Sequence, residues 1–304
     1  MNKKFLVTGA SGFIGKPLVS CLSQMPGVTV LGVGRSSKPS GHLRYQRVDL
    51  SDPGKLKAIL KKERPDCIFH LAGGRSGEIL QMVNDNVSTT VNVFEAIRSL
   101  KDYHPRVVIT GSAAEYGKIT GRKRPVHENA PTHPAGLYGW VKLLQTRTAL
   151  HYAGLGEDVV IARLFNILGP GIQEDMAAGQ FVKELLHLEK SSRPKFLNVS
   201  NLEGMRDFLD IRDICEALVI LSLKGKKGEI YNICSQKGVI MREFLNMMIT
   251  ASGQRGIKVK ENRKNKPGVI YAVGSSAKLR QITGWKAKYS LSQSILDTLA
   301  FYRL

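Results

Sequence analysis

Cysteine is scarce in this sequence, and the few cysteines share no pattern. The 304 residues contain four, with no CxxC pair and no clustered histidine: Cys21, Cys67, Cys215 and Cys234. Zinc and iron–sulfur sites take their ligands at such close spacings, and small secreted proteins carry a denser cysteine framework. We therefore expect reduced, buried thiols, no disulfides and no metal site.

Long hydrophobic runs are also missing. No apolar stretch reaches the roughly 20 residues that span a bilayer. The N-terminal sequence MNKKFLVTGASGFIG begins with lysines, but Thr8, Gly9, Ser11 and Gly12 interrupt its apolar part. Because a signal peptide needs a continuous apolar core, we interpret this segment as a first strand. We expect a cytoplasmic protein with no membrane span.

Acidic residues are few. The sequence has 25 Asp and Glu against 45 Lys and Arg, a net charge of +20. Near the C-terminus only Glu261 stands among a basic group: Arg255, Lys258, Lys260, Arg263, Lys264 and Lys266. Such an excess can attract nucleic acid or an anionic membrane surface, but no zinc-finger, RRM or helix-turn-helix pattern accompanies it. An anionic small substrate or a solvated basic face explains the charge as well, so we predict no nucleic-acid partner.

Strand-like and helix-like segments alternate along the chain. Short apolar runs predict strands over residues 5–10, 28–34, 67–73, 106–112 and 158–166. Helical spacing predicts helices over 14–22, 51–62 and 86–100, and a further helix that carries Tyr138. This order is typical of an α/β fold with a doubly wound parallel sheet. After Gly169 the pattern loosens. We predict a Rossmann domain over 1–165, partly interleaved with 207–235, and a smaller C-terminal substrate-binding lobe formed mainly by 166–304.

A glycine array follows the first predicted strand. TGASGFIG places Gly9, Gly12 and Gly15 in a GxxGxxG spacing where the first helix begins. Glycine lets the backbone approach a pyrophosphate, and a helix N-terminus offers free N–H groups to its charge. In this strand–turn–helix context the array predicts dinucleotide binding. Close packing of the turn is the structural alternative.

The end of the second predicted strand indicates which dinucleotide. NAD-selective proteins carry an acid there for the ribose hydroxyls. In LGVGRSS we place Gly32 where the acid would stand, followed by Arg35 and Ser36. A guanidinium and a hydroxyl suit a 2′-phosphate, so we favour NADP(H) and keep NAD(H) as the alternative. Arg35 lying over the adenine or pointing to solvent is the structural alternative.

Tyr138 and Lys142 stand four residues apart in LYGWVKLLQ, at the start of a predicted helix. Side chains at i and i+4 lie on one helical face. An ammonium beside a phenol favours the phenolate and lowers the pKa of Tyr138 towards neutrality, where it can exchange a proton. A surface tyrosine with a solvated lysine is the alternative, against which the upstream glycine array argues.

Further motifs carry a resemblance to a known family. ITGSAAEYG places Ser112 at the end of the fourth predicted strand. Ser112, Tyr138 and Lys142, in this order after TGASGFIG, resemble the catalytic triad of the extended short-chain dehydrogenase/reductase superfamily. ARLFNILGPG, NLEGMRDFLDIRDI, GEIYNICS and ITGWKAKYSLSQSILDTL extend the resemblance over nearly the whole chain. They resemble most the GDP-4-keto-6-deoxy-D-mannose reductase group, which forms GDP-rhamnose by reducing a C4 ketone with a nicotinamide hydride.

The motifs and the resemblance together imply the binding residues. Those expected at the cofactor are Gly9, Ser11, Gly12, Phe13, Ile14, Gly15, Arg35, Ser36, Asp49, Leu50, Leu71, Ala72, Gly73, Tyr138, Lys142 and Phe165. Those expected at the substrate are Asn86, Ser112, Ala113, Asn166, Arg206 and Lys266. Asn86 matches the family's helix-opening asparagine. For Arg163 and Arg206 an interdomain ion pair is the structural alternative.

Two departures from the family bear on the chemistry. Related 4,6-dehydratases carry an acid two residues before the tyrosine of the Tyr-Gly pair, and this chain has Ala114 there. Alanine cannot remove a proton, and the neighbouring Glu115 should point elsewhere, so dehydration is disfavoured. Where the family often has Arg-Pro for the diphosphate, this chain has Lys266-Pro267, which keeps the charge without the bidentate fork.

These features predict a nucleotide-sugar 4-ketoreductase that uses NADPH on a 4-keto-6-deoxy sugar. A nucleotide-sugar 4-epimerase with retained NAD has the same triad and is the first alternative. A non-catalytic dinucleotide-sensing regulator on this fold is the second, although it would not need the triad. By resemblance, we expect a homodimer formed through the helices of Asn86 and Tyr138.

Overall fold

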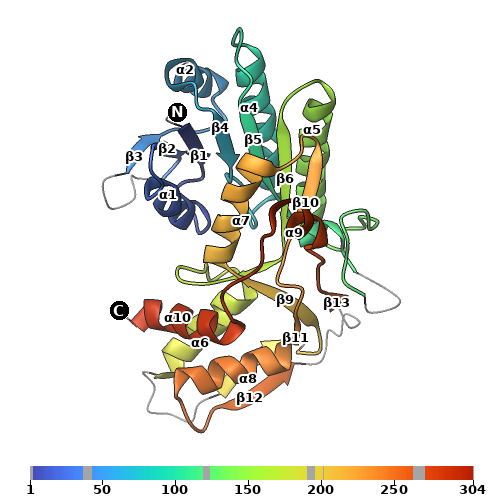
Figure 1. Cartoon of the computed structure of the whole chain (residues 1–304). Coiled ribbons are helices and arrows are strands. Elements are labelled where there is room, and N and C mark those ends of the chain that lie inside the picture. The colour runs from blue at the N-terminus through green and yellow to red at the C-terminus, as the bar shows by residue number, and fades with distance from the viewer. Residues whose placement is uncertain are drawn as a thin grey trace.

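A seven-stranded sheet is the main feature of the computed structural model, which describes residues 3–36, 43–118, 124–189, 196–200, 202–262 and 271–303 (Figure 1). All neighbouring strands in it pair in parallel, which confirms the predicted sheet. In spatial order its strands are β10 (Glu229–Ile233), β6 (Val159–Leu164), β5 (Arg106–Ser112), β4 (Cys67–His70), β1 (Lys3–Thr8), β2 (Val28–Gly34) and β3 (Arg44–Arg47).

Helices cover both faces of this sheet. Successive side chains of a strand point to opposite faces, and both faces are apolar here: Phe5 and Val7 pack into one core and Leu6 into the other. One core includes residues of α1 (Gly15–Ser23), α7 (Ile211–Lys224) and α9 (Ala277–Thr283). The other includes residues of α2 (Pro53–Glu63), α4 (Thr89–Arg98) and α5 (Leu137–Gly154). The sheet is therefore doubly wound.

The strand order reverses between β1 and β4. From β1 the chain continues outward through β2 and β3, whereas β4 lies on the other side of β1 and continues through β5, β6 and β10. Ligands of such sheets bind at this switch point, outside the carboxyl ends of the strands. The loops after β1 and β4 meet here, since a Cβ atom on Gly9 would lie 2.9 Å from the backbone nitrogen of Ala72.

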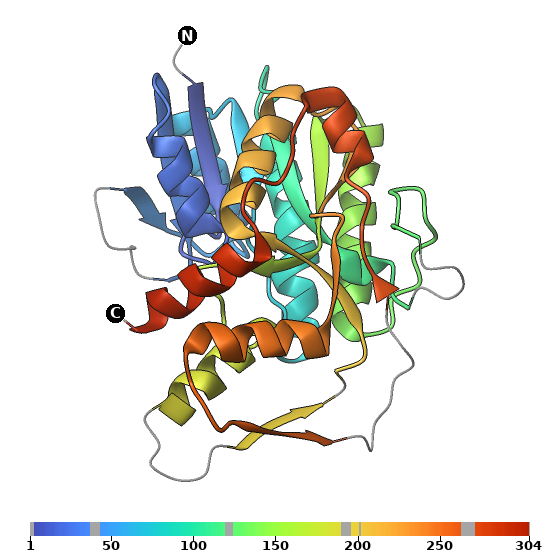
Figure 2. The same cartoon turned by 60° about the horizontal axis from the view of Figure 1, so that its bottom comes forward.

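The second half of the chain contributes a smaller lobe with its own core (Figures 1 and 2). Its central strand β9 (Met205–Asp210) pairs with β7 (Asn166–Leu168), β11 (Gly238–Ile240) and β13 (Tyr271–Ala272). A separate pair joins β8 (Phe196–Ser200) to β12 (Lys258–Asn262). Side chains of α6 (Ala177–Glu189), α8 (Met241–Ser252) and α10 (Leu291–Arg303) fill the core between them.

Three predicted boundaries are wrong. The strand predicted over 158–166 breaks at Phe165, and its last part becomes β7 in the other sheet. The strand predicted over 67–73 ends at His70, because the following loop turns across the carboxyl edge. The helix predicted from Asn86 begins earlier, as α3 (Ile79–Val83), and passes through a π-helical turn, η1 (Asn84–Ser88), before α4.

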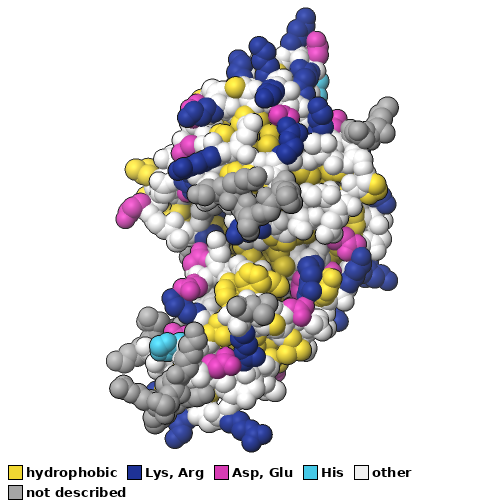
Figure 3. All heavy atoms as spheres, turned by 90° about the vertical axis from the view of Figure 1, so that its left-hand side faces the viewer, with side chains coloured by type: hydrophobic (Ala, Val, Ile, Leu, Met, Phe, Trp, Pro, Cys, Tyr) yellow, Lys and Arg dark blue, Asp and Glu magenta, His cyan; other side chains and the backbone are white. Residues whose placement is uncertain are grey.

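On the face in Figure 3, Lys and Arg side chains are spread over the surface with Asp and Glu between them. The four cysteines are free thiols; three are buried and Cys21 is partly buried. Within the described ranges, no group of three or more His, Cys, Asp or Glu residues is arranged to hold a metal ion. No helix among those residues has the length and apolar character needed to cross a membrane.

Candidate active site

The glycine array forms a tight loop between β1 and α1. Gly9 has φ +65°, and a Cβ atom on Gly15 would lie 2.1 Å from the carbonyl oxygen of Gly9, so no larger residue fits at position 15. No acidic residue stands in the first turn of α1, whose N-terminus opens at the carboxyl edge of the sheet. The loop therefore suits a pyrophosphate, because backbone approach and helix-end charge are both available.

A turn at the end of β2 lies at the same carboxyl edge of the sheet. The strand continues to Gly34, and Gly32 pairs in mid-strand with Val7. The prediction for the acid position was therefore two residues early, since the strand's last residue is Gly34. Arg35 follows with a half-exposed side chain that donates to both Asp85 oxygens, at 2.8 and 3.1 Å. Neither structural alternative for Arg35 anticipated this partner.

The loop after β3 borders the same edge. Asp49 is exposed, and its carboxylate accepts a hydrogen bond from the Ser51 backbone at 3.0 Å. That bond is the main cause that lowers the pKa of Asp49. The neighbouring Leu50 is buried, and its carbonyl accepts from Asn92 of α4 at 2.8 Å. The turn is thus held by helix α4, leaving the Asp49 side chain at the surface.

Tyr138 and Ser112 meet at the carboxyl edge of β5. Ser112 is the last residue of β5 and Tyr138 lies in the first turn of α5, as the sequence predicted. Burial raises the pKa of the Tyr138 phenol, while the positive charge of Arg75 and a hydrogen bond with Ser112 act in the opposite direction. The prediction that the pKa of Tyr138 falls towards neutrality is therefore wrong.

Lys142 is held by β5 and by its own helix. Its ammonium donates to the Thr110 carbonyl at 2.5 Å and to the Gln145 side chain, and the residue is only 5% exposed. Burial lowers the pKa of Lys142 to about 8. The cation that opposes the pKa shift of Tyr138 is Arg75, whose guanidinium lies 5.6 Å from the centre of the Tyr138 ring.

Sequence reasoning missed Arg75, although it directly follows the HLAGG segment. Its side chain also approaches Asp175, with 3.7 Å between Nε and Oδ2. Asp175 precedes α6 in the smaller lobe, so Arg75 links the loop after β4 to that lobe above Tyr138. An arginine directly after the HLAGG segment could have been noted as a candidate site residue. The position of Arg75 over the Tyr138 phenol, however, depends on how α5 packs.

A buried chain of polar side chains connects Lys142 to the base of the glycine loop. Gln145 donates to Thr90 at 3.0 Å, and the two nitrogens of His70 lie 3.1 Å from the Thr90 hydroxyl and 2.9 Å from the Thr8 hydroxyl. Burial lowers the pKa of His70 to about 3, so the imidazole is neutral. Thr8 immediately precedes Gly9 and accepts from the backbone of the loop after β4. This chain fixes both cofactor-side loops relative to the lysine.

Glu115 points away from the cleft, as predicted. It is fully buried and accepts from the Ser112 backbone at 2.7 Å, from Thr146 at 3.0 Å, and from Arg163 at 2.6 and 3.1 Å. The guanidinium of Arg163 also lies 4.5 Å from the centre of the Tyr116 ring. Arg163 therefore forms an ion pair, but the pair joins the 3-10 turn after β5 to β6 and not two domains, so the interdomain alternative is wrong.

Asn86 supports the loop after β4. It is 1% exposed, and its amide donates to Gly74 at 2.9 Å and to Met82 at 2.8 Å. A Cβ atom on Gly73 would lie 2.5 Å from the Asn86 side-chain oxygen. The predictions that Asn86 opens a helix and contacts substrate are wrong, because its side chain is buried beneath the loop within a continuous helix.

The remaining predicted residues lie towards the smaller lobe. Phe165 is 5% exposed and its ring packs with Tyr116, Val126 and Cys234, so the cofactor contact predicted for this residue stays a prediction. Asn166, in β7, donates to the Asp207 carbonyl at 2.9 Å. Arg206, in β9, is half-buried, and burial lowers its pKa. Lys266 lies outside the described residues.

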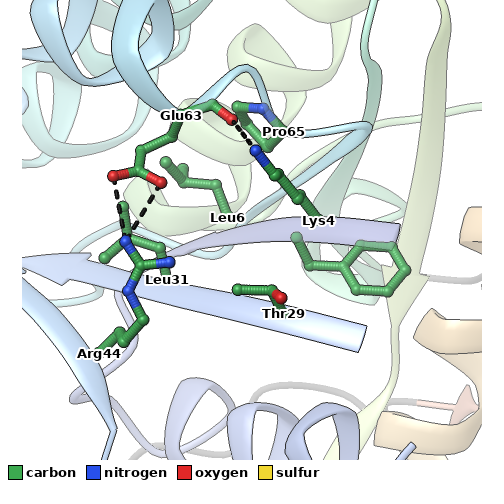
Figure 4. Close-up of a pocket in the computed structure, with 8 residues that line it drawn as sticks. Lys4, Leu6, Thr29, Leu31, Arg44, Glu63 and Pro65 are labelled. Carbon is green, nitrogen blue, oxygen red and sulfur yellow. Dashed lines mark hydrogen bonds and ion pairs between the residues drawn. The ribbon is translucent and has the colours of Figure 1, made fainter. Parts of the chain in front are cut away.

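A small hollow at the opposite edge of the sheet is unrelated to this chemistry (Figure 4). It lies at the amino ends of β1, β2 and β3, where Arg44 and Glu63 form an ion pair at 3.2 Å beside Lys4. Ligands of parallel sheets bind at the carboxyl edge, where the glycine loop is. We assign this hollow no role in the site.

Known proteins share this fold and sequence pattern. The chain is 28% identical to GDP-6-deoxy-D-mannose reductase of Pseudomonas aeruginosa, covering 99% of this chain and 97% of that protein. It is 25% identical to UDP-glucose 4-epimerase of Azospirillum brasilense, covering 97% and 90%. The structure of RMD from Pseudomonas aeruginosa complexed with NADPH is similar at TM-score 0.85 and 26% identity, covering 100% and 99%. The pattern of one family matches residues 5–234, and the chain therefore belongs to the NAD-dependent epimerase/dehydratase family.

Proposed function

We propose that this protein is a nucleotide-sugar 4-ketoreductase that uses NADPH to reduce the C4 ketone of a nucleotide-linked 4-keto-6-deoxy sugar, with a GDP-4-keto-6-deoxymannose-like substrate favoured. The observation that carries the proposal is the meeting of Ser112 and Tyr138 at the carboxyl edge that also holds the glycine loop. The similarity to GDP-6-deoxy-D-mannose reductase supports the substrate class.

The roles of the residues follow from their positions. A bound nicotinamide supplies the hydride. Tyr138 gives its proton to the oxygen that forms at C4, and Ser112 holds the same oxygen by a hydrogen bond. Lys142 holds the first turns of α5 against Thr110 and, in this proposal, also contacts the nicotinamide ribose. Arg75 stabilises the phenolate that remains after proton transfer, since its charge lies over the ring.

Dehydration chemistry has no base in this arrangement. Ala114 stands at the position of the dehydratase acid, and both oxygens of Glu115 are occupied within a buried ion pair. A reductase needs only the proton on Tyr138 and a hydride. The local chemistry of Ala114 and Glu115 therefore favours reduction over 4,6-dehydration.

Arg35 supports NADPH over NADH. It stands directly after the end of β2 with a half-exposed guanidinium, and no acid occupies the strand end. Asp85 fixes the guanidinium through two hydrogen bonds, so the charge is preorganised at the rim of the cleft. The NADPH complex of a similar protein agrees with this choice, and NAD(H) stays the alternative because other relatives bind NAD.

The smaller lobe is proposed to hold the sugar nucleotide. Residues 1–165, with 207–235 interleaved, would form the cofactor domain, and 166–304 would form mainly the substrate lobe. Asn166 and Arg206 come from neighbouring strands of the lobe sheet and are proposed to bind the diphosphate, together with Lys266. Ala113, in the 3-10 turn η2 (Ala113–Glu115) after β5, would border the sugar.

A 4-epimerase is the second candidate, because several relatives at similar identity are UDP-glucose 4-epimerases. The two functions differ in cofactor balance. A reductase consumes about one NADPH per product, whereas an epimerase reverses the hydride transfer on the same molecule. A panel of GDP-, dTDP-, CDP- and UDP-linked 4-keto-6-deoxy sugars, followed by NADPH oxidation, tests the proposal. Conversion of a saturated nucleotide sugar without added nicotinamide would reject it in favour of the epimerase, and inactivity on both classes would favour the regulator.

We also propose a cytoplasmic homodimer formed through α3, α4 and α5. Large apolar side chains on α3 and α5 are exposed: Ile79, Leu80, Leu137, Trp140 and Leu144. Burying them in a symmetric interface removes apolar surface from water. Light scattering should give twice the mass of the chain, and Trp140→Glu should give the mass of a monomer. A monomeric wild type would reject the dimer.

A further inference from the structure

We propose that Tyr45 excludes an acidic side chain from position 34, because its hydroxyl occupies, from β3, the place from which such an acid would bind the ribose hydroxyls. The inference rests on the proposed function in that the coenzyme binds along this edge. It goes beyond that function in naming a residue on a different strand as the group that keeps an acid out of position 34. Tyr45 was absent from the predicted site because it belongs to none of the motifs, although it lies in the short segment between Ser36 and Asp49.

The first observation is the position of the ring. A Cβ atom on Gly34 would lie 2.9 Å from the Tyr45 hydroxyl oxygen, closer than real Cβ contacts, but 3.8 Å from Cζ. On the same face of β2, a Cβ atom on Gly32 would lie 3.1 Å from Cδ2 of the ring. The ring thus lies along two glycines, and it packs against the core at the base of α1.

The second observation connects this place to the coenzyme loop. The same Cβ position on Gly34 is 3.5 Å from the Ser11 hydroxyl oxygen, in the glycine loop. A carboxylate at position 34 would therefore stand between β2 and the residues proposed to hold the pyrophosphate. That is the location from which an acid binds the ribose hydroxyls in NAD-selective proteins. The Tyr45 hydroxyl lies there instead.

The third observation is that β3 also braces the arginine turn. Tyr45 donates to the Ser36 carbonyl at 3.0 Å, and Arg47 donates to the Arg35 carbonyl at 2.9 Å. The backbone after β2 is therefore held by two side chains of β3, and the Arg35 guanidinium is held by Asp85. Tyr45 keeps an acid out of position 34, and β3 and Asp85 hold Arg35 in place. Both effects favour a coenzyme with a 2′-phosphate over one with a 2′-hydroxyl.

Moving the hydroxyl aside would cost its bond to Ser36, so Tyr45 and an acid at position 34 compete for one place. The conflict depends on the hydroxyl oxygen alone, because Cζ of the Tyr45 ring is at an ordinary contact distance from a Cβ atom at position 34. Phenylalanine at position 45 keeps the ring and its packing but makes room for the acid. Comparing Gly34→Asp with tyrosine or with phenylalanine at position 45 therefore tests the hydroxyl alone.

The experiment compares the wild type with Gly34→Asp, Tyr45→Phe and the double variant, using the full chain. NADPH and NADH are titrated separately, and binding is followed by nicotinamide fluorescence. Tyr45→Phe should keep the preference for NADPH. Gly34→Asp alone should weaken NADPH binding at least about tenfold while leaving NADH within about threefold of wild type. The double variant should bind NADH about tenfold more tightly than Gly34→Asp does, the low end for a charge-assisted hydrogen bond.

Equal NADH affinity in Gly34→Asp and the double variant would overturn the inference. An NADH affinity that aspartate at position 34 raises neither with tyrosine nor with phenylalanine at position 45 would also overturn it. Melting temperature is the second measurement: Gly34→Asp should melt below the double variant, because only the former carries the clash, and equal melting would count against the clash. A wild type that binds neither coenzyme would reject the proposed function itself. Coenzyme binding by the wild type, with no difference between Gly34→Asp and the double variant, would reject only the role of Tyr45.

Discussion

Replacing Glu115 by glutamine should strongly destabilise the protein, because it breaks a buried ion pair that also holds the backbone of Ser112. Glu115 is 0% exposed and Arg163 is 2% exposed, with 2.6 Å between their closest atoms. A glutamine amide would direct an N–H group at the Arg163 donors or at the Ser112 backbone N–H. The Arg163 guanidinium would then lose its main acceptor, and one of its nitrogens already has no hydrogen-bond partner.

The expected cost is about 3–5 kcal/mol, the usual loss when one partner of a buried ion pair is removed. The cation–π contact with Tyr116 offsets only part of it. Since a domain's total stability is about 5–15 kcal/mol, the variant should unfold at much lower urea concentration. Far-UV circular dichroism during urea titration measures the free energy of unfolding for the wild type, Glu115→Gln, Arg163→Met and the double variant.

The double variant is the matched control. If the ion pair causes the loss, the double variant should be more stable than the sum of the single losses predicts, because no uncompensated charge is left. Methionine has a similar length and can pack against Tyr116. A loss below about 1 kcal/mol for Glu115→Gln, or strict additivity in the double variant, would refute the argument that this pair holds Ser112 in place.

Tyr138→Phe should bind coenzyme normally but lose about 10²–10⁴-fold in turnover, since the proton donor is gone; turnover near wild type would remove Tyr138 from the mechanism. Arg75→Gln should raise the pKa of Tyr138, so the alkaline fall in kcat/KM should move to higher pH, and Arg75→Lys should largely restore it; an unmoved limb would contradict a role for this charge. His70 should make stability fall with acid. Its folded pKa of about 3 lies below the unfolded value, so stability present above pH 6.5 is lost as the pH falls. From pH 7 to 5 this loss is about 2 kcal/mol. Urea titrations at both pH values should show a smaller difference for His70→Gln, and an equal difference would exclude His70 as the cause.

Features that depend on neighbours in sequence were predictable from the sequence. The alternation of apolar runs and helical spacing predicts the parallel sheet, because each segment must bury its own apolar face. The glycine spacing depends on one strand–turn–helix, and the loop has the contacts that only glycine allows. The four-residue spacing of Tyr138 and Lys142 correctly predicts one helix. Even the orientation of Glu115 follows from its place one residue beyond Ala114.

Features that depend on distant residues were decided only by the tertiary structure. The positive charge that opposes the rise in the Tyr138 pKa belongs to Arg75, whereas the buried ammonium of Lys142 donates to a carbonyl of β5 and to a glutamine of its own helix. The spacing of two residues cannot show which other groups compete for a side chain. Asn86 was misplaced for the same reason, since its amide is taken by the loop after β4.

The coenzyme end of the site shows most clearly that the sequence alone does not reveal contacts between distant residues. Arg35 is visible in the sequence, but its partner Asp85 is 50 residues away. Tyr45 reaches Gly34 only because β3 pairs with β2 in a register that sets Gly34 opposite Arg47 and Gly32 opposite Tyr45. Register is a property of the assembled sheet, and a shift by one residue would turn the tyrosine to the other face. Sequence thus determined the class of ligand, whereas strand pairing decided what occupies the acid's place.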